Sequence, residues 1–409
     1  MAKRILFIGN GVTLAHIGRP LVLAEAVDPA RYSVHFACDA RYRRWLGTFD
    51  GAWREIHTQD SASFLAAIAR GEPPYSTASL CKETEEDLDL IDDIQPDLVV
   101  ADFRLSMRIA SSVRQVPYAC ITNTHWSPQF SGRYRLPDLP GLGLSRVVGA
   151  RNAARLGEVF LPLMLRRFSW PMNRARRRFG LPALDAGIQQ VYSAADHFIY
   201  AESEHYSPLS HPPSNHHYAG PIVWEPPVNL PAWWPDVPEG RPLVYVSMGS
   251  SGNVSVLPSI IQGLEGLEVT TVVSTAGACE VTDRPDTLFS ADYLPASRVI
   301  DRASLVIGNG GSMMLHQALK AGVPMLAIPS NMDQQMCIAP FVACGAVREL
   351  RLASVTPASV RAAASAMLAR PAYHQSSDAT AQRLRACDPA QRFNQILATI
   401  TGETCANVN

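Results

Sequence analysis

The sequence predicts an α/β protein with two doubly wound, mostly parallel sheets, one in each half of the chain. Short apolar runs of strand length alternate with helical patterns in both halves, and this alternation is typical of parallel sheets covered by helices. The 409 residues are enough for two or three domains of roughly 100–200 residues each. A proline-rich segment over residues 221–242 separates the halves and predicts a stiff, extended linker.

Each predicted sheet opens with a strand that runs into a glycine turn, at Gly9-Asn10-Gly11 in the first half and at 248–252 in the second. A helix is expected through residues 21–27. The predicted strands cover 4–8, 33–37, 98–101 and 119–122 in the first half and 243–246, 269–274, 305–307 and 325–328 in the second. Because ligands bind at the carboxyl ends of the strands in such sheets, functional residues are expected just after these runs.

The composition excludes several classes of protein. A net charge of -1 gives no reason to expect binding to nucleic acid. The eight cysteines include no Cys-x-x-Cys pair, so we expect reduced intracellular thiols rather than a zinc site or a disulfide framework. The apolar stretch at 5–8 is too short for a signal peptide, and no apolar run approaches the length of a membrane span. A cytoplasmic protein without stable membrane insertion is therefore expected.

Residues 306–334 are the most informative segment. An apolar run ends in a glycine-rich turn at 309–312, and a helical pattern follows at once, as where a strand delivers a turn to a helix N-terminus. Free backbone N–H groups and the helix dipole favour a phosphate at such a position. A second apolar run then places Asp333 and Gln334 at the end of the next strand. A phosphate cradle followed by a carboxylate and an amide predicts a site for a nucleotide-sugar.

This segment resembles the donor-binding signature of the UDP-glycosyltransferase superfamily, which includes plant and macrolide-modifying glycosyltransferases with the GT-B fold. Asn309 stands where the superfamily has a histidine, and Gln317 where it has a ribose-binding acid. Both residues keep hydrogen-bonding capacity and lose charge. The positions that match the signature are Gly311, Gly322-Val323-Pro324, Asp333 and Gln334. The resemblance implies two Rossmann-like domains that face a central cleft.

The resemblance also assigns roles to the parts of the chain. It implies an acceptor-binding domain over 1–220, the linker over 221–242, a donor-binding domain over 243–388, and a tail over 389–409 that crosses back to the first domain. Tyr293 would stack on the base, although core packing explains an aromatic residue there equally well. Donor contacts are expected from Gly11, Gly249, Ser250, Ser251, Tyr293, Asn309, Gly310, Gly311, Ser312, Gln317, Asp333 and Gln334.

Two residues of the first half are candidates for catalysis. His16 follows the first glycine turn, and Asp102 ends another predicted strand, so both lie at the same sheet edge. A carboxylate that accepts from one imidazole nitrogen leaves the other nitrogen as a base. The pair resembles the catalytic His–Asp dyad of the superfamily, including the aromatic Phe103 after the acid. Taken singly, each has an ordinary explanation, as a polar surface residue and as a helix cap.

The remaining candidates are less specific. His125 and Trp126 follow a strand and could line an acceptor pocket or simply pack. The arginine-rich segment 151–178 could rest on anionic lipid as a peripheral contact, but a solvated helix face is the commoner explanation. The adjacent histidines His216 and His217 have no suitably spaced partners for a metal, so we interpret them as part of a loop. The Asp-x-Asp at 87–89 lies in an acidic helical stretch rather than at a strand end, which is a poor place for a metal, and no metal is expected.

The predicted function is an inverting, metal-independent glycosyltransferase that needs no cofactor, since the nucleotide-sugar is a co-substrate. It would move glucose or N-acetylglucosamine, with UDP expected as the carrier rather than dTDP, to a hydroxyl of a small acceptor that is apolar or of the natural-product kind. Two alternatives share the fold: a sugar-nucleotide epimerase and a non-catalytic sugar-nucleotide-binding protein. A nicotinamide oxidoreductase could be read from Gly9-x-Gly11 with Asp39, but Leu14 occupies the third glycine position of that fingerprint.

Overall fold

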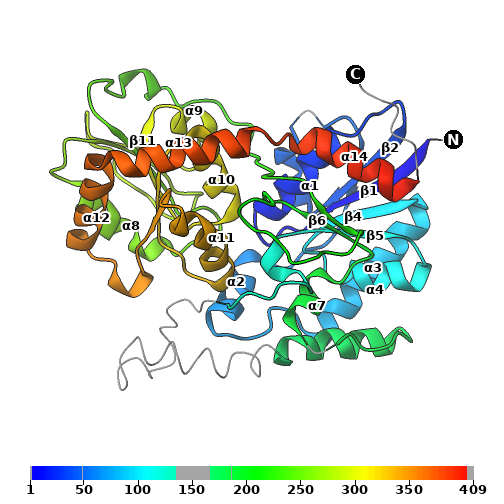
Figure 1. The fold of residues 1–409 in the computed structure, drawn as a ribbon. Coiled ribbons are helices and arrows are strands. Elements are labelled where there is room, and N and C mark those ends of the chain that lie inside the picture. The colour runs from blue at the N-terminus through cyan, green and yellow to red at the C-terminus, as the bar shows by residue number, and fades with distance from the viewer. Residues whose placement is uncertain (1, 48, 135–165, 186, 403–409) are drawn as a thin grey trace. The chain divides into compact units, whose positions relative to one another are not determined.

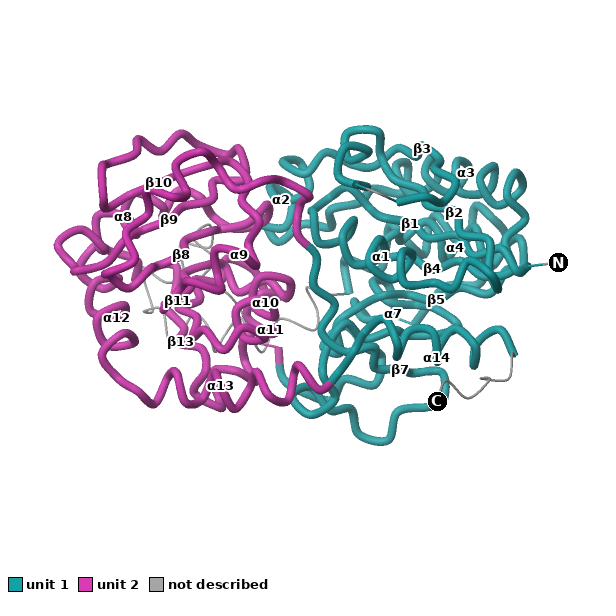
Figure 2. Tube along the Cα trace, turned by 90° about the horizontal axis from the view of Figure 1, so that it is seen from above, with its two compact units in different colours: residues 1–133, 156–224, 387–409 teal, residues 134–155, 225–386 magenta. Residues whose placement is uncertain are grey.

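The computed structural model describes residues 2–47, 49–134, 166–185 and 187–402. They form two compact units, each built around a parallel sheet (Figures 1 and 2). Unit 1 is drawn from Met1–Arg133, Leu156–Trp224 and Cys387–Asn409, and unit 2 from Tyr134–Arg155 and Glu225–Ala386. The predicted α/β class with two Rossmann-like sheets is confirmed.

Unit 1 contains a seven-stranded sheet in the order β3-β2-β1-β4-β5-β6-β7, and every pairing in it is parallel. The order reverses on the two sides of β1, which is the arrangement of a doubly wound sheet. Its elements are β1 (Lys3–Gly9), α1 (Ala15–Glu25), β2 (Tyr32–Cys38), η1 (Ala40–Trp45), β3 (Ala52–Glu55), α2 (Ser61–Ala69), α3 (Thr77–Ile94), β4 (Leu98–Asp102), α4 (Met107–Arg114), β5 (Tyr118–Thr122), η2 (Thr124–Trp126), α7 (Ile188–Ser193), β6 (His197–Tyr200), β7 (His216–Tyr218) and α14 (Pro389–Thr401).

Alternate residues of each central strand enter different cores, because side chains along a strand point to opposite faces. Ile5 and Phe7 of β1 belong to the core that contains α1 and α14, whereas Leu6 and Ile8 belong to the core beneath α3 and α4. All four side chains are fully buried. The continuous apolar run of β1, with no polar alternation, is thus explained by a strand that is covered on both faces.

The last helix, α14, packs in unit 1 although 160 or so residues of unit 2 precede it in the chain. Phe393 is fully buried and meets Phe7 edge-on, with ring centroids 5.8 Å apart. The Asn394 side chain donates to the carbonyl of Ala26 at 2.7 Å, just past the end of α1. Helix α14 is therefore part of the unit 1 core.

Gly220 follows the edge strand β7 and packs against Cys387, which precedes α14. We expect Gly220→Ala to destabilise unit 1 by about 1–3 kcal/mol. Its φ of +91° is left-handed, and a Cβ would lie 2.2 Å from the sulfur of Cys387. The shift of the urea midpoint measures the effect. Gly240→Ala is the matched control, since a Cβ there meets nothing within 4 Å; equal midpoints for the two variants would contradict this reading.

Unit 2 contains a six-stranded parallel sheet in the order β10-β9-β8-β11-β12-β13. Val244 and Val246 of its central strand β8 pack with α8 and α12 in one core. Its elements are η4 (Trp234–Asp236), β8 (Leu243–Ser247), η5 (Val254–Val256), α8 (Leu257–Leu264), β9 (Thr270–Ser274), β10 (Leu288–Ala291), α9 (Ala296–Ile300), β11 (Ala303–Gly308), α10 (Ser312–Ala321), β12 (Met325–Ala327), α11 (Met332–Ala343), β13 (Val347–Glu349), η6 (Leu352–Ser354), α12 (Pro357–Ala369) and α13 (Pro371–Arg385).

The structure corrects two local predictions. His216 and His217 form the edge strand β7 rather than a loop, because β6 offers a free edge on which this polar segment pairs. The helix expected through residues 21–27 ends at Glu25, and it begins at Ala15, beside His16, so Pro20 lies inside it. The proline-rich segment 221–242 is partly packed: Ile222 is buried in the unit 1 core.

Part of the arginine-rich segment, 151–165, lies outside the described residues. The described remainder includes a helix at 166–178, and most of its arginines are exposed there. Arg176 differs, because it is buried and its Nε donates to the carbonyl of Pro182 at 2.8 Å. Among the described residues, no helix combines the length and the apolar character that a bilayer span requires.

Candidate active site

His16 and Asp102 meet at the carboxyl edge of the unit 1 sheet. Gly9 pairs with Asp102 in the register of β1 and β4, so the two strands end side by side. The turn after β1 then brings His16, in the first turn of α1, over the end of β4. His16 Nδ1 lies 2.7 Å from Asp102 Oδ1. An ionised carboxylate can only accept, so Nδ1 carries a hydrogen, and in the neutral form of the ring Nε2 then has the lone pair.

Arg19, which sequence reasoning missed, holds the same carboxylate. Its Nε donates to Oδ2 of Asp102 at 2.7 Å, and its Nη2 donates to Oδ1 at 2.9 Å. Its Nη1 donates to the side-chain oxygen of Asn123, just after β5, at 3.0 Å. Arg19 and Asp102 are both almost fully buried. Burial by itself would raise the pKa of Asp102, but the charge of Arg19, together with the hydrogen bonds from His16 and Arg19, outweighs it and holds that pKa below its ordinary value.

The Phe103 ring packs against one face of the His16 imidazole. Its ring stacks on His16 with centroids 4.9 Å apart and planes inclined by 16°. Its backbone has a φ of +57°, which is unusual for a bulky residue and costs about 1–3 kcal/mol. The Asn10 side chain helps to hold this conformation by donating to the carbonyl of Phe103 at 2.8 Å. The strain is placed at the residue that orients the candidate base.

Arg104 anchors the same loop from below. It is fully buried, and its Nε and Nη2 both donate to Oδ1 of Asp87, at 3.0 and 2.9 Å. Glu86 accepts from the same guanidinium at 2.8 Å, and Glu83 lies 3.8 Å away. The acidic stretch that looked unsuited to a metal thus supplies counter-charges to an arginine two residues beyond Asp102.

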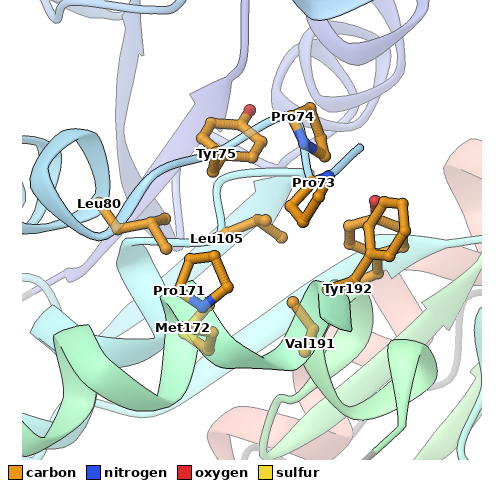
Figure 3. Close-up of a pocket in the computed structure, with 10 residues that line it drawn as sticks. Pro73, Pro74, Tyr75, Leu80, Leu105, Pro171, Met172, Val191 and Tyr192 are labelled. Carbon is orange, nitrogen blue, oxygen red and sulfur yellow. The ribbon is translucent and has the colours of Figure 1, made fainter. Parts of the chain in front are cut away.

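A small apolar pocket lies near this edge of unit 1 (Figure 3). Its Tyr192 ring lies 5.1 Å from Phe103, so a single aromatic ring separates the pocket wall from His16. The hydroxyl of Tyr75 accepts from the Asn10 side chain at 3.1 Å. Other side chains around the pocket are Leu80, Leu105, Pro171, Met172 and Val191.

The predicted acceptor residues lie close to this wall without lining it. Trp126 meets Tyr192 edge-on at 5.0 Å, and His125 is buried beside Trp126 in η2. Gly11 lies in the first glycine turn, where its carbonyl accepts from the hydroxyl of Tyr42 at 2.6 Å. The assignment of these residues to the acceptor and the donor stays a prediction.

In unit 2, the turn after β11 brings several predicted donor residues together. Gly310 has a φ of +76°, and a Cβ there would lie 2.5 Å from Ile338. The side-chain oxygen of Asn309 accepts from the N–H of Gly311 at 2.9 Å, directly before α10. The Asn309 nitrogen lies 3.4 Å from the hydroxyl of Ser251. Asn309 therefore joins the turn at 309–312 to the loop after β8.

Gln334 ties a third segment to this arrangement. It lies in the first turn of α11, rather than at the end of β12 as predicted, because Asn331 caps that helix by accepting from the Gln334 N–H at 3.0 Å. Its side-chain oxygen accepts from the Ser330 N–H at 2.8 Å, and its nitrogen donates to the Ser251 carbonyl at 3.3 Å. The Gln334 amide is buried and supports the loop that contains Ser251.

The other predicted donor residues occupy the same edge or its flanks. Ser312 is buried as the first residue of α10, whereas Gln317 and Asp333 are half-buried in α10 and α11. Gly249, with a φ of +60°, and the exposed Ser250 lie in the loop after β8. The Tyr293 hydroxyl donates to the Ala276 carbonyl at 3.2 Å.

Proteins of Mycobacterium are similar to this chain over most of its length. A PGL/p-HBAD biosynthesis glycosyltransferase of Mycobacterium tuberculosis is 38% identical over 375 residues, which cover 92% of this chain and 87% of that protein. A PGL/p-HBAD biosynthesis rhamnosyltransferase of Mycobacterium bovis is 37% identical and covers 92% of this chain and 83% of itself. A further relative, named an inactive PGL/p-HBAD biosynthesis glycosyltransferase of Mycobacterium bovis, is 38% identical over 64% of this chain and 71% of that protein.

Solved structures and a family match agree on the fold. Spinosyn forosaminyltransferase SpnP has a TM-score of 0.70 at 16% identity, covering 98% of this chain and 100% of that one. Spinosyn rhamnosyltransferase SpnG, solved with thymidine diphosphate, has a TM-score of 0.67 at 15% identity, covering 97% and 99%. Residues 263–397 match the family described as the C-terminal domain of erythromycin biosynthesis protein CIII-like proteins. The chain therefore belongs to the GT-B glycosyltransferases of the UDP-glycosyltransferase superfamily, together with the PGL/p-HBAD biosynthesis glycosyltransferases.

Proposed function

We propose that this glycosyltransferase transfers a sugar with inversion from a nucleoside-diphosphate sugar to a hydroxyl of a small, apolar acceptor, and that His16 is its base. The contact of His16 Nδ1 with Asp102 at 2.7 Å carries the proposal. It sets the tautomer and leaves Nε2 able to take a proton. The same contact supports a transferase over a protein that only binds nucleotide-sugars, an alternative to be weighed because a relative is named inactive.

The chemical step balances without a redox partner. The acceptor oxygen attacks the anomeric carbon while the bond from that carbon to the diphosphate oxygen breaks. The acceptor proton passes to Nε2 of His16, and the diphosphate leaves with the bonding electrons. Attack from the face opposite the leaving group inverts the anomeric configuration. Proton removal by a positioned imidazole contributes about 10²–10⁴-fold to the rate of such a step.

Unit 2 would hold the donor. The turn at 309–312 precedes a helix N-terminus, which favours the diphosphate, and Asn309, Ser251 and Gln334 connect the segments around it. Backbone amides and the helix dipole would meet the departing charge, so we propose that transfer needs no divalent ion. Asp333 would contact sugar hydroxyls. The sequence favours UDP-glucose or UDP-N-acetylglucosamine, whereas relatives named rhamnosyltransferases favour trials with deoxysugars as well.

A donor and acceptor panel tests the proposal. UDP-glucose, UDP-N-acetylglucosamine and dTDP-rhamnose are each incubated with hydroxylated aromatic and aliphatic acceptors, and mass spectrometry looks for one added sugar. Proton NMR of the product reads the anomeric configuration, and a parallel reaction contains EDTA. Retention of configuration, or loss of activity with EDTA that Mg²⁺ restores, would refute the corresponding part. Donor binding without any product across the panel would favour the binding-protein alternative, and epimerised donor without acceptor would favour the epimerase.

Asn309 tests the donor half. We expect Asn309→Ala to weaken binding of the nucleoside diphosphate by about 1–3 kcal/mol, because the Gly311 N–H and the Ser251 hydroxyl lose a shared partner. Asn309→Asp keeps an acceptor for Gly311 and adds a negative charge, so it should bind the diphosphate more weakly still. Calorimetric titration of both variants measures this. Wild-type affinity in Asn309→Ala would show that the residue serves the turn alone.

A further inference from the structure

The charge around His16 is set by three side chains rather than two. Both oxygens of Asp102 are taken by the Arg19 fork, at 2.7 and 2.9 Å, and one of them also accepts from His16. With a neutral imidazole, the carboxylate and the guanidinium balance each other. A buried carboxylate that lost its guanidinium would be left without a counter-charge, which is strongly unfavourable in a protein interior.

Without Arg19, the nearest group able to supply that counter-charge is His16 itself. A proton on Nε2 would turn the imidazole into the cation that Asp102 requires, and a protonated imidazole cannot act as a base. With Arg19 present, the positive charge of the guanidinium opposes a second positive charge on the imidazole. Nη2 of Arg19 lies 3.3 Å from Nδ1 of His16, and because both nitrogens carry hydrogen, two donors face each other there.

We propose that Arg19 is a positioning residue of this site: its fork fixes Asp102 in place and supplies the counter-charge that leaves His16 neutral and ready to accept the acceptor's proton. The inference rests on the proposed role of His16 as the base. Arg19 acts through Asp102 and His16 and is not assigned a contact with either substrate. It links three elements, since it extends from α1 to the end of β4 and to Asn123 after β5.

The other described groups that contact Asp102 or feel its charge are neutral. Asn123 is neutral, and Phe103 faces the imidazole with an uncharged ring. Two titratable groups of β5 feel the Asp102 charge, Cys120 and Tyr118. Burial raises the pKa of Cys120 to about 12 and that of Tyr118 well above its ordinary value, so both are neutral at working pH.

The experiment titrates His16 by NMR in the full-length protein, with the ring signals assigned by comparison with His16→Gln. In Arg19→Met, we expect the midpoint of the His16 titration to move upward by about one pH unit or more, which is the size of an opposing interaction of ~1.4 kcal/mol. Arg19→Lys keeps the charge and should move the midpoint much less. Arg114→Met is the matched control, because Arg114 forms a similar fork on Asp92 at an exposed site.

A second arm separates this effect from a loss of folding. The double variant Arg19→Met with Asp102→Asn removes both buried charges, so it should fold, and the upward shift should disappear. Coupling between the two substitutions identifies Asp102 as the route through which Arg19 acts. An unchanged midpoint in Arg19→Met, or an upward shift on adding Arg19→Met to Asp102→Asn that equals the shift seen with Asp102 present, would overturn the proposal.

Activity gives the third arm. In Arg19→Met, the acidic limb of the pH profile of kcat should move upward together with the NMR midpoint, with turnover recovering at high pH. Arg19→Lys should keep the limb near its wild-type position and lower the plateau, because an ammonium cannot reproduce the two-bonded fork. A purely structural arginine would lower turnover equally at all pH values. If wild-type protein transfers no sugar, the proposed function fails, while the NMR titration still decides the role of Arg19.

Discussion

Replacing His16 with alanine is expected to lower turnover by about 10²–10⁴-fold, the range for a lost general base. The residue stands over the end of β4 with Nδ1 bonded to Asp102, so its removal takes away the proton acceptor and leaves the sheet edge intact. Donor binding should change little, because all but one of the residues predicted to contact the donor lie in unit 2. Steady-state rates at saturating donor, together with calorimetric titration of the nucleoside diphosphate, measure both quantities.

Substitution of a second histidine serves as a control that separates loss of the base from a general loss of structure. His205→Ala changes an exposed histidine of the same unit and should retain wild-type turnover. Asp102→Asn should cost less than His16→Ala, because the imidazole remains. Near wild-type transfer by His16→Ala would show that another group takes the proton, and the assignment of the base would then be wrong.

Replacing Arg104 with methionine should lower the free energy of unfolding by about 3–5 kcal/mol. We expect no other single substitution around the site to destabilise the protein more. The substitution keeps much of the apolar stem but leaves Asp87, Glu83 and Glu86 facing one another without their shared cation. The carbonyl of His57 also loses its donor. Because Arg104 follows Phe103 directly, we also expect weaker stacking under His16 and lower turnover. Urea denaturation of unit 1 measures the stability loss.

The pH dependence of this loss gives a second, independent check. Burial raises the pKa of Glu83 to about 7 even with Arg104 present, against an ordinary value of 4.5. A raised folded-state pKa stabilises the protein below the unfolded-state value, and this contribution fades as the pH rises toward 7. We expect Arg104→Met to raise the folded-state pKa of Glu83 further. The variant should therefore lose more free energy of unfolding at pH 8 than at pH 5.

An exposed fork provides the control for Arg104. Arg114 and Asp92 form the same two-bonded pair on the surface, where both side chains are more than a third exposed. Arg114→Met should change stability by less than about 1 kcal/mol, as exposed pairs do. Equal losses for the two arginines, or a loss in Arg104→Met that is the same at pH 5 and pH 8, would contradict the buried-charge explanation.

The encounter of His16 with Asp102 could be predicted because both residues were expected at the carboxyl ends of strands in one parallel sheet. Each residue follows a strand, and parallel neighbours bring their carboxyl ends to one edge. Arg19 was open to the same logic and was missed. It lies three residues after His16, a spacing that places two side chains on one face of a helix. An arginine in a helix is usually exposed, however, and only the packing of α1 onto β4 shows that this one is buried.

In unit 2, too, some features of the candidate donor site could be predicted from the sequence and others could not. The glycine turn before α10 could be predicted, since a strand, a turn and a helix follow one another in the sequence. The contacts of Asn309 and Gln334 with Ser251 could not, because they join segments 58 and 83 residues apart. The strand β7 was also missed, because its polar residues carry no hydrophobic alternation and pair only where β6 leaves an edge.

Local patterns were enough to predict the two parallel-sheet units and the sheet edges that hold the candidate residues, since hydrophobic period and glycine turns act within a few residues. His16 and Asp102 became the candidate base and its carboxylate because their places after two strands resemble the dyad of the superfamily. The tertiary structure alone decided which groups are charged, strained or committed: the Arg19 fork on Asp102, the left-handed Phe103 beneath His16, and the buried acids around Arg104. Burial and counter-charge arise only when distant segments pack together, and they set what each side chain can do.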